Sequence, residues 1–145
     1  MLRAGCIATA FALCATGAVA QPYVVTDDLG GLVGVRMIVI DAFRENETLV
    51  EIRGTCASAC TLFLGLDTTC VAPAAMLGFH GPSETNPEVP VTKAAWDATT
   101  RAMASYYPPA LRGPFLNRWR YLGDAQLAWV SGARLIEAGV RPCKT

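Results

Sequence analysis

Ser58 and His80 are the residues of this 145-residue chain whose types and spacing best suit covalent chemistry, and His80 is its only histidine. Ser58 lies in the small-residue segment GTCASACT at 54–61, where we expect a strand end, a tight turn and then a short apolar helix. A return strand over 76–79 ends immediately before His80. A serine at a strand-to-helix turn and a histidine at the end of the next strand can meet as a nucleophile and its general base.

Each of the residues that could form such a site also has a simpler structural role. Ser58 can be a helix N-cap, because serine is among the residues preferred at that position. His80 can be a strand-end histidine that is hydrogen-bonded to the backbone. Gly30-Gly31 can be only a tight turn between a strand and a helix, and Asp124 can be a helix cap after Gly123. On the residue pattern alone both interpretations stay open.

The elements that must position these side chains alternate between strands and helices. Alternating or β-rich runs predict strands over 23–26, 48–53, 70–72 and 76–79, with Gly54 to Ala57 as a turn. Apolar residues at helical spacing predict helices over 32–44, 59–66, 92–107 and 114–121, and a last short helix capped by Ser131 and ended by Gly139. A strand, a helix and a strand in succession form one crossover unit with parallel strands. The predicted fold class is therefore α/β, with a small, mainly parallel sheet and a helical C-terminal third.

Residues 1–20, MLRAGCIATAFALCATGAVA, have the features of a secretory signal peptide. Arg3 supplies the basic region, an apolar run follows, and Ala18-Val19-Ala20 is a small-x-small cleavage site. We expect the mature chain to be a single domain over 21–145, located in the periplasm or secreted. The alternative is a retained membrane anchor, for which this apolar run is short.

The charge balance argues against nucleic acid or anionic lipid as a partner. The chain has 12 Lys and Arg against 12 Asp and Glu, and cleavage would remove Arg3 alone among them. The expected mature chain then has one more acidic than basic residue and no basic face. No other stretch is long and apolar enough to span a membrane, so we expect no membrane association after cleavage.

Four of the six cysteines would remain after cleavage, namely Cys56, Cys60, Cys70 and Cys143. Four cysteines in an exported chain favour two disulfides, for which three pairings exist. We prefer Cys70–Cys143, which would tie the C-terminal tail to the return strand, and this leaves Cys56–Cys60 across the turn. Alternatively, three of these cysteines and His80 could hold a metal, but their spacing matches no common zinc pattern.

Three segments give the chain a resemblance to the ClpP/crotonase superfamily, and in particular to small exported ClpP-like proteins of Gram-negative bacteria. The first is Gly30-Gly31 opening a helix, and the second is the turn from Gly54 through CASACT to Thr61. The third is CVAP at 70–73 followed by Gly78-Phe79-His80. The segment SGARLIEAGV at 131–140 is similar to the helix-then-valine segment that closes the ClpP domain. Together these features cover most of residues 24–143.

The resemblance implies a serine peptidase site that needs no cofactor or metal. Ser58 would match the nucleophile and His80 the general base. The backbone N–H groups of Gly31 (or Gly30) and of Ala59 would form the oxyanion hole. Such preorganised donors stabilise the negative charge that develops on the substrate oxygen. The expected partner is then a peptide or a small ester or amide substrate, and a homo-oligomer is left open.

Two departures from the family pattern support a second interpretation. The family's triad aspartate would fall near Leu127, where this chain has none, and Asp124 is the nearest carboxylate. The strand and helix units that precede the Gly-Gly loop in ClpP-like chains are also missing. The alternative is a catalytically inactive ClpP/crotonase-like envelope protein that acts as a binding or structural module. Acyl-thioester chemistry is a third option, which export argues against because coenzyme A substrates are cytoplasmic.

Overall fold

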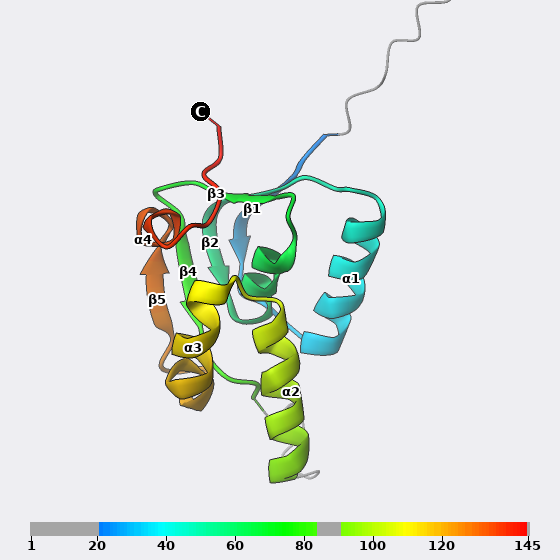
Figure 1. Ribbon diagram of the computed structural model, residues 1–145, viewed down its shortest axis with the longest axis vertical. Coiled ribbons are helices and arrows are strands. Elements are labelled where there is room, and N and C mark those ends of the chain that lie inside the picture. The colour runs from blue at the N-terminus through cyan, green and yellow to red at the C-terminus, as the bar shows by residue number, and fades with distance from the viewer. Residues whose placement is uncertain (1–20, 84–90, 145) are drawn as a thin grey trace, which may run out of the picture.

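The computed structural model describes residues 21–83 and 91–144, and the expected signal peptide lies outside these residues. They form five strands, four α-helices and two 3-10 helices (Figure 1). In chain order these elements are β1 Tyr23–Asp28, α1 Val33–Glu45, β2 Val50–Ala57, η1 Ser58–Gly65, β3 Thr69–Val71, β4 Met76–Phe79, α2 Lys93–Ser105, α3 Pro109–Asn117, η2 Trp119–Tyr121, β5 Ala128–Ser131 and α4 Gly132–Glu137. The predicted strands and the first, second, third and last of the predicted helices are confirmed with small shifts of their ends.

The sheet has the order β1-β2-β4-β5, and β3 also pairs with β2. β2 runs parallel to β1, β3 and β4, whereas β5 pairs with β4 in the antiparallel direction. The predicted α/β class with a small, mainly parallel sheet is therefore confirmed. The prediction of a helical C-terminal third is wrong in one respect, because β5 lies within it. Ala128–Ser131 is too short for its alternation to be recognised, and its pairing with β4 makes it a strand.

Gly54 to Ala57 is not a turn, because β2 continues through these residues to Ala57. Gly54 is needed for close packing, since a Cβ there would lie 2.0 Å from the carbonyl oxygen of Thr26 on β1. The register of β1 against β2 shifts between Val25 and Asp27, opposite this point. The glycine thus marks an irregularity in a strand, a position that a sequence pattern does not distinguish from a turn.

The helix predicted over 114–121 is also wrong in its bounds. α3 starts at Pro109, where the fixed φ of proline suits the first helical position, and it continues through Pro114 to Asn117. The chain then forms the separate short helix η2. Pro109 therefore begins a helix before the predicted start at residue 114.

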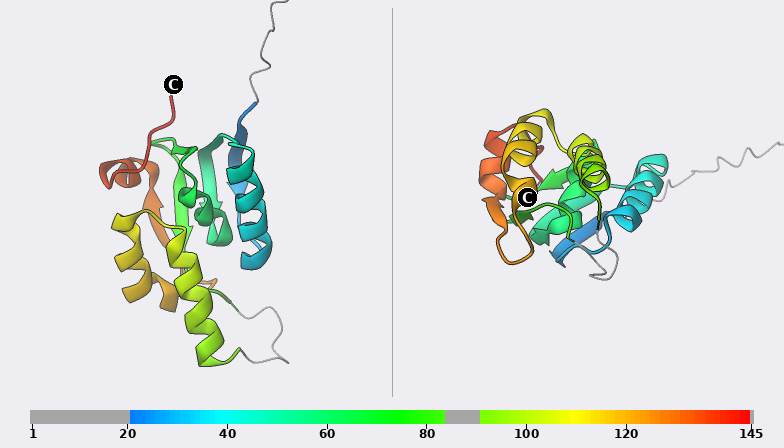
Figure 2. Two further views of the ribbon diagram at one scale, coloured as in Figure 1. Left: turned by 45° about the vertical axis from the view of Figure 1, so that its right-hand side comes forward. Right: turned by 90° about the horizontal axis from the view of Figure 1, so that it is seen from below.

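The helix η1 lies at the centre of the hydrophobic core. Its residues from Ala59 to Leu64 are all buried, as the apolar pattern predicted. α1 contacts it, and α2 and α3 pack on the same face of the sheet (Figures 1 and 2). Side chains on the opposite face of the sheet, such as Arg53, Met76 and Trp129, are exposed. None of the helices in the described part of the chain has the length and apolar character needed to cross a bilayer.

Candidate active site

Ser58 occupies a sharp corner between β2 and η1. Its φ angle is +56°, in the left-handed region that residues other than glycine rarely adopt. Such a backbone conformation costs about 1–3 kcal/mol and persists only where the surroundings enforce it. A serine held on a strained strand-to-helix turn is the arrangement that exposes the nucleophile in many hydrolases. The sequence placed Ser58 at this junction but carried no sign of its left-handed conformation.

Two buried hydroxyl groups hold the corner from the core side. Thr61 Oγ1 donates a hydrogen bond to the carbonyl oxygen of Ser58 at 2.7 Å, and it lies 2.8 Å from the hydroxyl oxygen of Tyr107. Because Thr61 has one hydroxyl proton, Tyr107 must be the donor in the second bond. Burial raises the pKa of Tyr107 well above its ordinary value, which keeps this donor protonated. Neither residue was identified as part of the site from the sequence.

Both predicted disulfides are present, and one of them brackets Ser58. Cys56 and Cys60 are bonded across the corner, and Cys70 and Cys143 tie β3 to the C-terminal tail. The alternative of a metal held by these cysteines and His80 is therefore wrong, because disulfide sulfurs are not thiolate ligands. Residues 21–83 and 91–144 also contain no cluster of three or more His, Cys, Asp or Glu side chains that could hold a metal ion.

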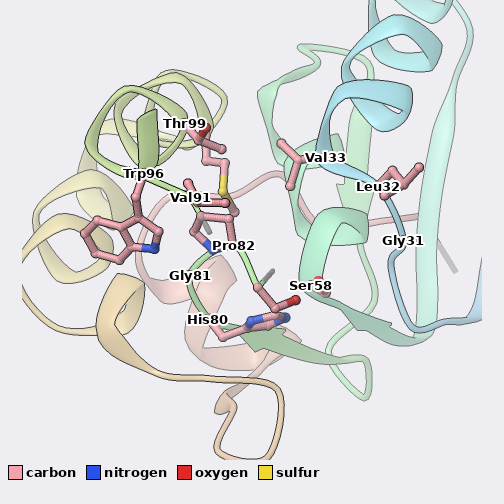
Figure 3. A pocket seen from close by; sticks show the side chains of 12 residues that line it. Gly31, Leu32, Val33, Ser58, His80, Gly81, Pro82, Val91, Trp96 and Thr99 are labelled. Carbon is pink, nitrogen blue, oxygen red and sulfur yellow. The ribbon is translucent and has the colours of Figure 1, made fainter. Parts of the chain in front are cut away.

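The register of the sheet brings Ser58 and His80 to the same edge. Ala57, the last residue of β2, pairs with Gly78 of the parallel strand β4. The carboxyl ends of both strands therefore lie side by side, and Ser58 follows one of them while His80 follows the other. The imidazole is 6% exposed and Ser58 is half-buried. Ser58 and His80 line the same cavities (Figure 3).

Asp124 is the carboxylate beside the histidine. Its Oδ1 atom lies 3.5 Å from Nδ1 of His80, while the side chain of Asp124 is 68% exposed. This pair has the distance of an ion pair but not the geometry of a hydrogen bond, so the buried Nδ1 atom has no hydrogen-bond partner among the described residues. With Nδ1 directed toward Asp124, Nε2 is the ring nitrogen left for a proton of Ser58. Leu127, where a family aspartate would fall, lines the same cavity as Asp124.

The Gly30-Gly31 loop lies directly against the serine corner. A Cβ on Gly30 would be 2.5 Å from Cβ of Ser58 and 2.9 Å from the backbone nitrogen of Ala59, so no side chain fits there. Both glycines have positive φ angles, of +104° and +118°. Gly30 is therefore a glycine for reasons of space and conformation, and Gly31 for reasons of conformation alone.

The side chain of Asp28 uses one of the predicted oxyanion donors. The N–H of Gly30 donates to Asp28 Oδ1 at 2.8 Å, and Arg36 fixes the loop by binding Asp28 Oδ2 at 2.7 Å and the carbonyl of Gly30 at 3.1 Å. The N–H groups of Gly31 and Ala59, in contrast, make no hydrogen bond within residues 21–83 and 91–144. Of the three predicted donors, these two are the ones left for a ligand. Asp28 and Arg36 were not identified from the sequence.

Two adjoining cavities open at the serine, and both include Gly31, Ser58 and His80 in their walls. The first, of about 200 Å³, extends between α1 and α2 and is shown in Figure 3. Its described walls contain no Asp, Glu, Lys or Arg side chain, and its apolar residues are Leu32, Val33, Pro82, Val91, Trp96 and Met103. The second, of about 460 Å³, is more open and is lined by Leu29, Asp124 and Leu127. The site thus combines an apolar recess with a wider and more open groove that includes Asp124.

A cationic side chain fixes the aromatic wall of the recess. The guanidinium carbon of Arg120 lies 5.1 Å from the ring centre of Trp96 and 4.8 Å from that of Tyr121. Arg120 also reaches the carboxylate of Asp97 at 3.4 Å. A hydrogen bond from Lys93 lowers the pKa of Asp97, which keeps this carboxylate charged beside the guanidinium. Trp96 is therefore held in place by its contact with Arg120.

The arrangement can support nucleophilic catalysis in which a hydroxyl, an imidazole and two backbone donors act together. Within the described residues, Oγ of Ser58 makes no hydrogen bond, including to His80. Catalytic hydrogen bonds are often loose in unliganded sites and tighten in the complex with substrate.

A scan of the chain against protein-family models and a search of curated proteins both find no match.

Proposed function

We propose that this protein is an exported serine hydrolase, acting as a peptidase, with Ser58 as nucleophile and His80 as general base. The observation that carries the proposal is the left-handed corner at Ser58, located beside His80 and beside two unengaged backbone N–H groups. A strained corner persists only when the surrounding structure enforces it, and such corners cluster at functional sites. The ClpP/crotonase-like core that the sequence resembles is part of the same proposal.

In the proposed reaction, Nε2 of His80 takes the proton of Ser58 as the serine oxygen attacks the substrate carbonyl carbon. The carbonyl oxygen becomes an oxyanion, which the N–H groups of Gly31 and Ala59 stabilise. The imidazolium then gives its proton to the leaving amine or alcohol, and an acyl-serine remains. Water, deprotonated by His80, hydrolyses that ester and restores the serine. Asp124 favours the imidazolium through its negative charge in the intervening steps.

The cavities suggest how a substrate would lie. The recess bounded by Leu32, Val33 and Trp96 would take an apolar side chain or acyl group next to the scissile carbonyl. The open groove beside Asp124 would leave room for the departing group and for water. The two disulfides support the exported location, because such bonds persist in oxidising compartments.

The test is labelling with a fluorophosphonate, which forms a covalent bond with an activated serine. The purified full chain should be labelled at Ser58, and labelling should be abolished in Ser58→Ala and strongly reduced in His80→Ala. Ser83→Ala is the matched control, because Ser83 lines the same cavities but has no proposed role. An unlabelled wild type, or equal labelling of Ser58→Ala, would contradict the proposal.

A second candidate function is binding without catalysis, as an envelope protein that keeps the scaffold. The observation in its favour is that Ser58 Oγ and His80 share no hydrogen bond within the described residues, and that Asp124 is largely in solvent. Such a protein would bind a peptide or an apolar ester in the recess without turnover. This second function would be favoured if the fluorophosphonate does not label Ser58 while an apolar peptide binds saturably. Val33→Asp, which puts a charge in the recess, should then weaken that binding.

A further inference from the structure

We propose that the Cys56–Cys60 disulfide is a positioning element for Ser58, so that the oxidation state of this bond sets the reactivity of the site. This inference rests on the proposed hydrolase function of Ser58 and His80. The bond closes a short ring that contains both the nucleophile and one of the two oxyanion donors, Ala59. A change in the backbone of this ring would therefore displace two catalytic groups together.

The position of the bond requires the chain to reverse at Ser58. Cys56 lies two residues before the serine in β2, and Cys60 lies two residues after it in η1. Their Cα atoms are 5.3 Å apart. A continued strand would separate residues four apart by roughly 13 Å. The bond is thus incompatible with β2 running straight on, and the residue at the centre of the reversal is the one with a φ angle of +56°.

The other contacts at the corner are non-covalent. The hydroxyl of Thr61 holds the carbonyl oxygen of Ser58, and Gly30 packs behind its Cβ. Neither contact joins the strand end at Cys56 to the helix start at Cys60. Within the described residues the disulfide is the covalent cross-link between these two sides, in addition to the main chain. Without it, the left-handed conformation of Ser58 would compete with the right-handed conformation that serine ordinarily prefers.

The second disulfide provides a matched comparison. Cys70 and Cys143 are 73 residues apart in sequence and join β3 to the C-terminal tail. Neither of them lines the two cavities that contain Ser58 and His80. This bond constrains the unfolded chain far more than the Cys56–Cys60 bond does, because loop-closure entropy grows with the length of the loop. Its removal should therefore lower the stability of the fold without moving the serine.

The oxidation state of the Cys56–Cys60 bond can be changed by ordinary thiol–disulfide exchange. A dithiol such as dithiothreitol gives two electrons and two protons to the Cys56–Cys60 bond and becomes a cyclic disulfide, leaving two protein thiols. Both cysteines are 0% exposed, so this exchange requires the corner to open or the chain to refold. A chain that folds under reducing conditions would therefore lack the clamp and have a less reactive serine.

The experiment measures the rate constant of fluorophosphonate labelling at Ser58 for folded protein, with circular dichroism giving the folded fraction. Cys56→Ala/Cys60→Ala should label roughly 10- to 100-fold more slowly than wild type, because small misplacements of reacting groups have effects of that size. Cys70→Ala/Cys143→Ala should label at the wild-type rate per folded molecule.

A second arm keeps the test informative if the double variant does not fold. Wild type refolded from urea with dithiothreitol should label roughly 10- to 100-fold more slowly per folded molecule than oxidised wild type. The same treatment of Cys70→Ala/Cys143→Ala removes the Cys56–Cys60 bond alone and should slow labelling to the same extent. Wild-type rates in the variant or in the reduced protein would overturn the inference, as would an equal loss in oxidised Cys70→Ala/Cys143→Ala. Absence of labelling in oxidised wild type would instead overturn the hydrolase proposal on which the inference rests.

Discussion

Oδ1 of Asp124 lies 3.5 Å from Nδ1 of His80, yet the carboxylate is 68% exposed while the imidazole is 6% exposed. In a site with a buried triad acid, loss of that acid lowers turnover about 10⁴-fold. A carboxylate in contact with water acts through a high dielectric, where a charge at this separation is worth only about 1 kcal/mol. The pair therefore has the residue types of the acid and base of a triad without the hydrogen bond between them, and its electrostatic strength is expected to be small.

We expect Asp124→Asn to lower the rate of fluorophosphonate labelling only about fivefold, which is the rate equivalent of about 1 kcal/mol. The measurement is the second-order rate constant for wild type and variant at neutral pH and low salt. Asp67→Asn is the control, because Asp67 is exposed and lines a different cavity, beside Arg44 and Glu47. A loss of 1,000-fold or more would show that this exposed carboxylate acts as a full triad acid.

Replacing Gly30 should disable the site, whereas replacing a glycine nearby in sequence should not. In Gly30→Ala the new methyl group would meet Cβ of Ser58 at 2.5 Å, at a φ angle of +104°. We expect a destabilised protein whose serine is labelled at least tenfold more slowly. Gly34→Ala is the matched control, because Gly34 lies in α1 with open space around it. That variant should label normally and gain about 0.5–1 kcal/mol of stability.

The hydroxyl groups of Thr61 and Tyr107 should contribute unequally to the free energy of unfolding. Thr61→Val removes the hydrogen bond to Ser58 and leaves the buried hydroxyl of Tyr107 without an acceptor, which should cost about 1–3 kcal/mol. Tyr107→Phe removes only the second bond and should cost about 0.5–1.5 kcal/mol. Urea unfolding of both variants and of the double variant measures the two effects and their coupling. A larger loss in Tyr107→Phe would contradict the assigned donor and acceptor roles.

The stability of the protein should fall at alkaline pH because of Tyr107. Burial raises the pKa of this phenol above its ordinary value of 10.0, so above that pH the unfolded chain loses a proton that the folded protein keeps. The free energy of unfolding is therefore unaffected by this group below pH 10.0 and decreases as the pH rises further, by up to about 1.4 kcal/mol per pH unit. Urea unfolding between pH 9 and 11 checks this, since Tyr107→Phe should show a shallower decrease whereas Tyr121→Phe, with an exposed ring, should not.

The apolar recess should select neutral substrates. Because its described walls carry no Asp, Glu, Lys or Arg, a charged acyl group would lose its hydration there without gaining a partner. We expect kcat/KM for a p-nitrophenyl butyrate ester to exceed that for the corresponding succinate monoester at least tenfold. Val33→Asp should lower kcat/KM for the butyrate ester more than kcat/KM for the succinate monoester. Equal rates for the two esters would show that the acyl group does not enter the recess.

Much of the site was predictable because it depends on local patterns and on a general rule of sheets. The alternating run over 48–53 and the apolar run after Ser58 predicted a strand followed by a buried helix, which the structure confirms, although the turn predicted over Gly54 to Ala57 belongs to the strand. Side chains at the carboxyl ends of parallel strands meet at one edge, so Ser58 and His80 were expected to be neighbours. The sequence left three cysteine pairings open, and the preferred one, Cys70–Cys143 with Cys56–Cys60, is confirmed.

Several features that decide the chemistry were not predictable in this way. The hydrogen bond between Thr61 and Tyr107 joins residues 46 apart in sequence, and neither residue carries a local signal of the other. The strand β5 exists only through its pairing with β4, and Gly54 belongs to a strand because of its contact with β1. Such features result from packing between distant segments, which periodicity does not encode.

The sequence by itself determined the α/β class, the succession of most elements, a preference for two disulfides and the location of a serine and a histidine at neighbouring strand ends. Only the tertiary structure decided the left-handed conformation of Ser58, the use of the Gly30 N–H by Asp28 and the exposure of Asp124. Composition and periodicity report which face of an element is apolar. A strained backbone angle and a free or occupied N–H depend instead on contacts from several elements at once, and these exist only after the chain has packed.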